Sequence, residues 1–132
     1  MKLVDTTIAV DHLRGASAAT DLLAGLISDG QTLVASEITR FELLAGVRKA
    51  ELEALEAFFS SLAWAPIDEQ ISRAAGTLAH RLRRSHSGID DADYLIAATA
   101  MVLEADLLTT NVRHFPMIEG LRAPYCVSSR DG

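Results

Sequence analysis

Length and composition indicate one ordinary folded domain. The chain has 132 residues, 49% hydrophobic and 23% charged, so we expect a single domain over residues 1–132. No apolar run reaches the roughly 18 residues that cross a bilayer, which argues against a membrane protein. The net charge of −6 argues against general electrostatic binding to nucleic acid. A single cysteine, Cys126, excludes an internal disulfide and fits a reducing compartment, so we expect a cytoplasmic location.

Short apolar runs alternate with helical patterns along the chain, which predicts βαβ units and a mostly parallel sheet in an α/β protein. Pro66 and Pro124 cannot donate hydrogen bonds to a neighbouring strand, so the third and fifth strands should be edges. The first, second and fourth strands should then be central. The five expected strands cover residues 2–5, 31–35, 64–67, 106–109 and 124–127.

The segments between these strands carry the apolar spacing of amphipathic helices. Asp29-Gly30 is a turn pair that should end the first clear helix, and Asp68 is a plausible N-cap for a later one. The expected helices cover residues 17–28, a segment that begins near residue 39, 51–62, 69–84 and a last helix that opens at Asp93.

Four polar residues fall where such a sheet would bring them to one edge. Asp5 ends the first strand, and Glu42 lies in the first turns of the helix after the second. Asp93 opens a helix, and Asn111 follows the fourth strand. Ligands bind at this edge of open α/β sheets. Three acids with an amide oxygen suit a hard divalent cation, since Mg²⁺ prefers oxygen ligands and relieves the repulsion between crowded carboxylates.

Three of these residues also have a purely structural interpretation. Asp5 could cap the helix that follows it. Thr39 and Glu42 match a capping box, and that segment taken alone favours the box. Asn111 is typical of a turn that adopts left-handed geometry. Convergence of all of them on one crevice is what favours a functional interpretation.

Asp93 carries the clearest functional signal of the four. It shares its side of the helix with small apolar residues that should pack on the sheet, so its carboxylate should point inward at the sheet edge. Asp90 and Asp91, in contrast, are better explained as acids that stabilise the start of the helix.

Other polar residues carry weaker signals. Arg81, Arg83 and Arg84 lie near a helix C-terminus, where cations are favourable, and contact with RNA phosphate is an equal alternative. The four histidines show no zinc-site spacing, and His114-Phe115 is expected to pack beneath the site. Cys126 is expected to be a buried thiol in an edge strand.

Four segments together resemble the conserved blocks of PIN-domain ribonucleases, in particular the VapC-type toxins of toxin–antitoxin pairs. They are "LVDTT" at 3–7, "SEITRFELLAGV" at 36–47, "DYLIAATA" at 93–100 and "LLTTNVRHFPMIEGL" at 107–121. The resemblance covers essentially the whole chain. It implies a three-layer α/β/α domain with a central, mostly parallel sheet of about five strands.

The resemblance also implies an activity, namely metal-dependent hydrolysis of RNA phosphodiesters by water with Mg²⁺ or Mn²⁺. By matching motif, Asp5 and Asp93 would hold the principal ion, and Glu42 would bind it through water or help to deprotonate the nucleophile. Asn111 stands where the family often has aspartate, which puts a second ion in doubt. The candidate supporting residues are Thr7, Thr109 and Asp91.

The partners implied by the resemblance are an RNA substrate, a cognate antitoxin protein and a second copy in a homodimer, with DNA reached only through the antitoxin. The main alternative is a catalytically silent PIN scaffold that binds RNA or a partner protein. A receiver-like signalling domain would need a lysine after its last strand, and the chain has only Lys2 and Lys49. An aspartyl phosphatase would need a second aspartate two residues after Asp5, where Thr7 stands.

Overall fold

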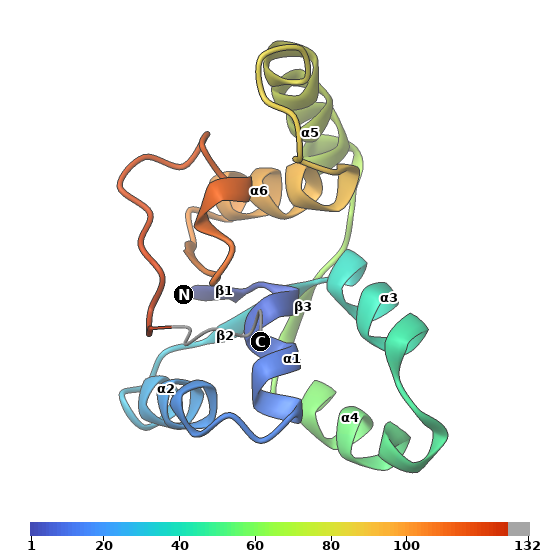
Figure 1. The fold of residues 1–132 in the computed structure, drawn as a ribbon, viewed down its shortest axis with the longest axis vertical. Helices are drawn as coiled ribbons and strands as arrows, with labels where there is room; N and C mark the ends of the chain where they lie inside the picture. Colours follow the sequence, from blue (N-terminus) through green and yellow to red (C-terminus); the bar gives the residue numbers. More distant parts are fainter. Residues whose placement is uncertain (127–132) are drawn as a thin grey trace.

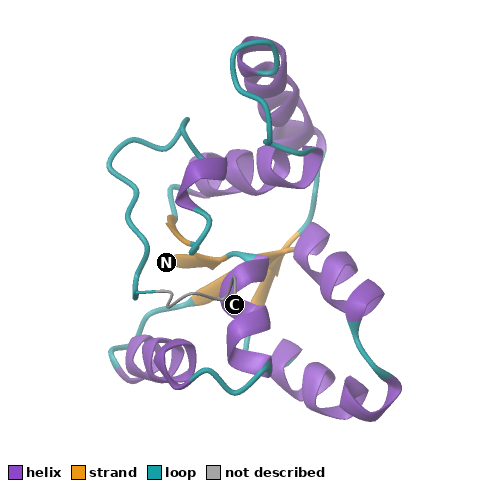
Figure 2. Ribbon diagram, viewed as in Figure 1, coloured by secondary structure: helices purple, strands orange, loops and turns teal. Residues whose placement is uncertain are grey.

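The structure is a computed structural model that describes residues 1–126, in which a four-stranded sheet lies between two groups of helices (Figures 1 and 2). The strand order is β3-β2-β1-β4, and each neighbouring pair is parallel. The strands are β1 (Lys2–Val4), β2 (Leu33–Ser36), β3 (Ala63–Ala65) and β4 (Asp106–Leu108). The helices are α1 (Thr6–Leu13), α2 (Ser17–Ser28), α3 (Glu37–Gly46), α4 (Leu52–Phe59), α5 (Glu69–Leu82) and α6 (Asp91–Leu103), with short 3-10 helices at Lys49–Glu51 and Val112–His114.

Side chains alternate across the sheet and so build a hydrophobic core on each of its faces. Leu3 and Val34 belong to the core beneath α5 and α6, which also contains Phe115. Their neighbours Val4 and Ala35 belong to the opposite core, against α1, α2, α3 and α4. The three-layer α/β/α architecture therefore follows from the alternation within strands of only three or four residues. None of the helices in residues 1–126 is long and apolar enough to cross a membrane.

Side-chain caps explain where two of the helices begin. Ser36 Oγ accepts a hydrogen bond from the backbone N–H of Ile38 at 3.1 Å, which starts α3 at Glu37 rather than near residue 39. Asp68 Oδ1 accepts one from the backbone N–H of Ile71 at 2.9 Å, which confirms the expected cap of α5. The predicted helix over 17–28 is confirmed as α2.

The sheet differs from the prediction at its fourth and fifth strands. Residues 124–126 form no strand, and residue 127 lies outside the described residues, so the described sheet has four strands. Within it, β4 is an edge strand rather than a central one. The Tyr125 hydroxyl donates to the Asp11 carboxylate at 2.6 Å, so a side chain anchors this segment to α1 in place of strand pairing. Cys126 is exposed, contrary to the expectation of a buried thiol.

Candidate active site

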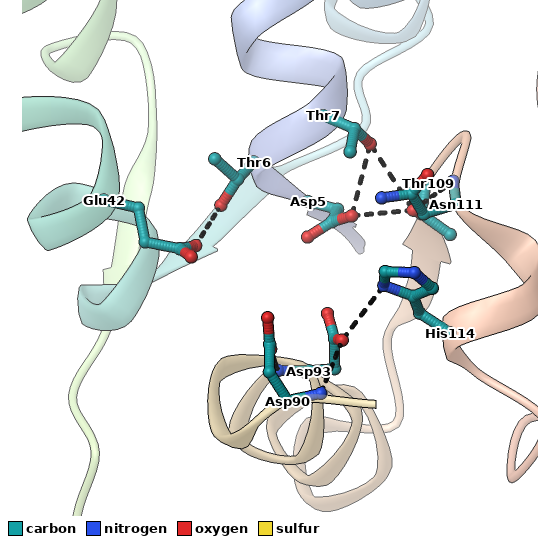
Figure 3. Close-up of polar contacts among 9 residues, drawn as sticks. All are labelled: Asp5, Thr6, Thr7, Glu42, Asp90, Asp93, Thr109, Asn111 and His114. Atoms are coloured by element: carbon teal, nitrogen blue, oxygen red, sulfur yellow. Dashed lines mark hydrogen bonds and ion pairs between the residues drawn. The ribbon is translucent and has the colours of Figure 1, made fainter. Parts of the chain in front are cut away.

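The predicted site residues come together where β1 and β4 end and where α1 and α6 begin, with α3 alongside (Figure 3). Figure 3 shows the carboxylates of Asp5, Glu42 and Asp93 facing the same opening. Asn111 lies next to Thr109 at the end of β4. The sheet therefore gathers residues that are widely separated in the sequence, as expected for the carboxyl edge of parallel strands.

Asp5 is buried between β1 and β4. Its Oδ2 accepts a hydrogen bond of 2.6 Å from Thr109 Oγ1 and one of 3.2 Å from Thr7 Oγ1. Its backbone occupies the N-cap position of α1, but its side chain makes no capping hydrogen bond. The capping interpretation is therefore wrong for the side chain, which is held toward the opening by two hydroxyl groups.

Glu42 reaches α1 rather than the start of its own helix. Its Oε1 accepts a hydrogen bond of 2.7 Å from Thr6 Oγ1. The predicted capping box between Thr39 and Glu42 is wrong, because Ser36 caps α3 and Thr39 lies one turn inside it. Thr39 instead places its own hydroxyl 3.2 Å from that of Thr6.

Asp93 combines a structural contact with an orientation toward the opening. Helix α6 begins at Asp91, and Asp90 and Asp93 form its capping box, each accepting a 3.1 Å hydrogen bond from the backbone N–H of the other. Asp93 Oδ2 also lies 3.1 Å from Nδ1 of His114. Asp93 therefore caps its helix and also points into the site, whereas the sequence had indicated a role at the start of the helix only for Asp90 and Asp91.

Asn111 is the N-cap of the short 3-10 helix after β4 and has φ −94°, so the left-handed geometry that asparagine can adopt in turns is not used here. Its backbone N–H donates to Thr109 Oγ1 at 3.0 Å. The backbone N–H of Thr110 donates to Thr7 Oγ1 at 3.2 Å. The chain after β4 is thus held by the same two hydroxyl groups that hold Asp5.

Burial raises the pKa of all three carboxyl groups, and nearby negative charge adds to this for Glu42 and Asp93. Burial raises the pKa of Asp5. The hydroxyl groups of Thr109 and Thr7, the backbone of Thr6 and the charge of His114 oppose this only in part. Burial also raises the pKa of Glu42, as do the negative charges of Asp5 and Asp90, against the hydrogen bond from Thr6. For Asp93, burial and the charge of Asp90 raise the pKa to about 6, against the backbone hydrogen bond of Asp90 and the charge of His114.

The carboxylate, hydroxyl and amide oxygens at this opening are the kind of donors that a hard cation prefers. Within residues 1–126, no three His, Cys, Asp or Glu side chains are arranged closely enough to hold one metal ion together. Mg²⁺ does not require such a group, because it keeps several waters and is commonly held by one or two carboxylates and substrate phosphate. The raised pKa values of Asp5, Glu42 and Asp93 give the independent reason that a cation would be favourable here.

Some predicted residues lie away from this opening. Asp91 is exposed and pairs with Arg83 at 2.8 Å, so the structure gives it no contact with the three carboxylates. Arg81 is in the last turn of α5, and Arg83 and Arg84 follow directly, as expected of basic residues at a helix C-terminus.

The sequence analysis did not predict a role for Thr6, and it placed both His114 and Phe115 in the packing beneath the site, where only Phe115 lies. Thr6 could have been found only by knowing that α1 and α3 are neighbours.

The comparisons with known proteins agree with this geometry. The PIN domain family matches residues 2–120. The chain belongs to the PIN-domain family. This PIN domain is 66% identical over 125 residues to "Ribonuclease VapC19" from Mycobacterium tuberculosis, which covers 95% of the chain and 100% of that relative. It is 44% identical over 127 residues to "Ribonuclease VapC10" from the same organism, covering 96% of the chain and 95% of the relative.

Solved structures show the same fold. The PIN domain superposes with a TM-score of 0.79 on a chain of a toxin–antitoxin complex from Klebsiella pneumoniae at 24% identity, covering 96% of this chain and 100% of that one. It superposes with a TM-score of 0.79 on a chain of VapBC2 from Rickettsia felis, bound to a promoter DNA fragment, at 25% identity, covering 92% and 96% of the two chains. The PIN domain is thus of the VapC type.

Proposed function

We propose that this protein is an endoribonuclease that acts as the toxin of a type II toxin–antitoxin system and hydrolyses RNA phosphodiesters. The observation that carries the proposal is the convergence of Asp5, Glu42 and Asp93 on one opening from three separate elements. The relatives named as ribonucleases support it, because one of them is matched over its full length at 66% identity.

We propose Mg²⁺ or Mn²⁺ as the cofactor, held by Asp5 and Asp93 with Glu42 in support. A divalent ion bound there would activate water and stabilise the negative charge that builds up on the phosphate. Asp5 would contribute a negative charge that Thr109 and Thr7 keep in place. Glu42, fixed by Thr6, would accept the proton of the attacking water or orient that water. Asn111, which is exposed at the edge, would position a water through its amide.

The partner we propose is an antitoxin protein that covers exposed apolar side chains on the α3–α4 side. Phe41 is 64% exposed, Leu44 40% and Leu52 41%, which is unusual for large apolar residues unless they meet a partner. One structure of similar fold is a toxin–antitoxin complex from Klebsiella pneumoniae, and two others are VapBC2 from Rickettsia felis and VapBC from Salmonella typhimurium, each bound to DNA. A homodimer, a cytoplasmic location and contact with DNA only through the antitoxin belong to the same proposal.

The direct test is cleavage of RNA by purified protein freed of any antitoxin. We expect discrete fragments from total bacterial RNA in the presence of Mg²⁺ or Mn²⁺, and none in EDTA, because the three carboxylates alone supply no electrophile. Fragment ends would identify the RNA. Equal cleavage with and without EDTA would refute the metal requirement. Binding of Mn²⁺ without any cleavage would identify the silent scaffold instead.

Thr6 is expected to act as a positioning residue for Glu42. Thr6→Val keeps the shape but removes the hydroxyl that donates to Glu42, so we expect kcat to fall roughly tenfold with KM little changed. Thr6→Ser retains the hydroxyl and should keep most of the wild-type kcat. The measurement is cleavage kinetics on one defined RNA oligonucleotide. If both variants lose activity equally, Thr6 acts through packing and not through its hydrogen bond.

A further inference from the structure

We propose a second, basic subsite at the C-terminal end of α5 that binds a backbone phosphate of the RNA outside the scissile position. This inference rests on the proposed ribonuclease function, whose substrate supplies regularly spaced phosphates. A cavity of about 550 Å³ lies there, lined by Ala79, His80, Arg83 and Arg84. Its position is separate from the three carboxylates, since none of them lines it.

The guanidinium group of Arg83 is held in place before any ligand arrives. Its Nη2 donates to Asp91 Oδ1 at 2.8 Å, and its Cζ lies 5.7 Å from the centre of the Tyr94 ring. Tyr94 is almost fully buried, which gives the guanidinium a rigid support. Arginine has five N–H donors in a fixed fork, so the contact with Asp91 leaves donors for a phosphate.

Helix α6 connects this subsite to the acidic site. Asp91 and Tyr94, which hold Arg83, flank Asp93 in the first turns of the same helix. The separation of Arg83 from Asp93 is therefore set largely by α6, which holds Arg83 through Asp91 and Tyr94, and not by the loop at 84–90. An extended RNA strand that presents one phosphate at Asp93 can place another at Arg83.

The charge balance of the molecule explains why such a subsite is needed. The chain carries a net charge of −6, and three carboxylates at the site repel RNA. Arg84 is exposed, and among the described residues it takes part in no ion pair, so its full charge is available. Phosphate contacts by arginine supply most of the sequence-independent affinity for nucleic acid. His80 adds an exposed ring that can donate a hydrogen bond.

The test measures RNA binding without cleavage. Antitoxin-free protein is titrated in EDTA against a fluorescently labelled single-stranded RNA of about 20 nucleotides, and anisotropy gives Kd at several salt concentrations. For the double variant Arg83→Gln/Arg84→Gln we expect Kd to rise roughly tenfold. The slope of log Kd against log salt should fall by about 1.4, since two phosphate contacts are lost at about 0.7 each.

Matched variants keep the result interpretable. Arg73→Gln removes an exposed arginine of the same helix that pairs with Glu69 outside the cavity, so Kd and slope should stay as in wild type. Arg84→Gln alone leaves the Arg83–Asp91 pair intact, and a fall of about 0.7 in slope is expected even if the double variant is unstable. The subsite would be overturned if Arg84→Gln and the double variant both had the same Kd and salt slope as the unchanged protein. It would also be overturned if the unchanged protein did not bind RNA.

A parallel cleavage assay with Mg²⁺ separates this inference from the proposed function. Asp93→Asn should lose cleavage but bind RNA in EDTA at least as tightly as wild type, because it removes a negative charge away from the basic cavity. Metal-dependent cleavage together with unchanged binding by the arginine variants would refute only the subsite. Weakened binding by those variants without cleavage by any protein would refute only the ribonuclease.

Discussion

Replacing Asp93 with asparagine is expected to reduce metal-dependent RNA cleavage by at least about 100-fold with the fold intact. Partners that merely orient a metal ligand are worth roughly 10- to 100-fold, so loss of a carboxylate that we propose holds the ion directly should exceed that. The asparagine Oδ1 can still accept the hydrogen bond that Asp93 takes from the backbone of Asp90. The start of α6 is therefore preserved while the negative charge is lost.

Two measurements decide this prediction. Single-turnover cleavage of a defined RNA at saturating Mg²⁺ gives the loss of rate, and Mn²⁺ titration gives the loss of affinity for the ion. Glu104→Gln is the matched control, because it removes one negative charge from the exposed far end of the same helix. Cleavage by Asp93→Asn within about threefold of wild type would remove Asp93 from the site.

Replacing Asp5 with asparagine is expected to abolish cleavage and, at the same time, to stabilise the metal-free protein at pH 8. Burial raises the pKa of Asp5 above its unfolded value near 3.8. Between these two pKa values the folded protein binds more protons than the unfolded chain, so the free energy of unfolding falls as pH rises. Above its raised pKa the folded wild type carries a buried negative charge on Asp5, whereas the variant has no charge to bury.

We expect Asp5→Asn to raise the free energy of unfolding by about 1 kcal/mol at pH 8, a Tm increase of roughly 4 °C, because relief of a strained site commonly gives gains of this size. The difference should shrink as the pH falls toward 4, because the raised pKa of Asp5 makes its carboxyl take up a proton more readily in the folded protein than in the unfolded chain. Mg²⁺ should raise the Tm of wild type at pH 8 but not that of the variant. Thermal unfolding followed by circular dichroism in EDTA and in Mg²⁺ measures each of these quantities.

A charge-matched variant controls for the overall reduction in negative charge. Lys2 holds the pKa of Asp106 below its usual value, so Asp106→Asn should lower stability slightly at pH 8, the opposite sign to Asp5→Asn. If both variants shift the Tm in the same direction, net charge is responsible and burial of Asp5 is not.

The sequence was sufficient for elements whose signals are local. The cap at Asp68 and the helix over 17–28 were predicted because capping residues and apolar spacing lie within a few residues of each other. The carboxyl edge of the sheet was predicted because parallel topology alone places Asp5 and Asp93 on the same side.

The sequence was insufficient where the partner of a residue lies far along the chain. Glu42 fits a local capping box with Thr39, yet it accepts its hydrogen bond from Thr6, 36 residues earlier. The prediction of a fifth strand at 124–127 was wrong over residues 124–126 for a similar reason. The segment has the apolar residues of a strand, but Tyr125 is held by a side-chain contact with Asp11, 114 residues away. Such long-range contacts override local propensity, and no spacing rule within a segment reveals them.

The position of β1 determines when during synthesis the protein becomes active. This strand pairs with β4 in the register Lys2 to Asp106, and the backbone N–H of Asp5 donates to the carbonyl of Leu108 at 2.9 Å. Strand β1 therefore lacks one of its two neighbours until β4, about 100 residues later in the chain, has been synthesised, and contacts over such a sequence separation are slow to form. A nascent chain that does not yet include Thr109 lacks the hydroxyl that holds Asp5, so the site stays incomplete until β4 and Thr109 have been synthesised.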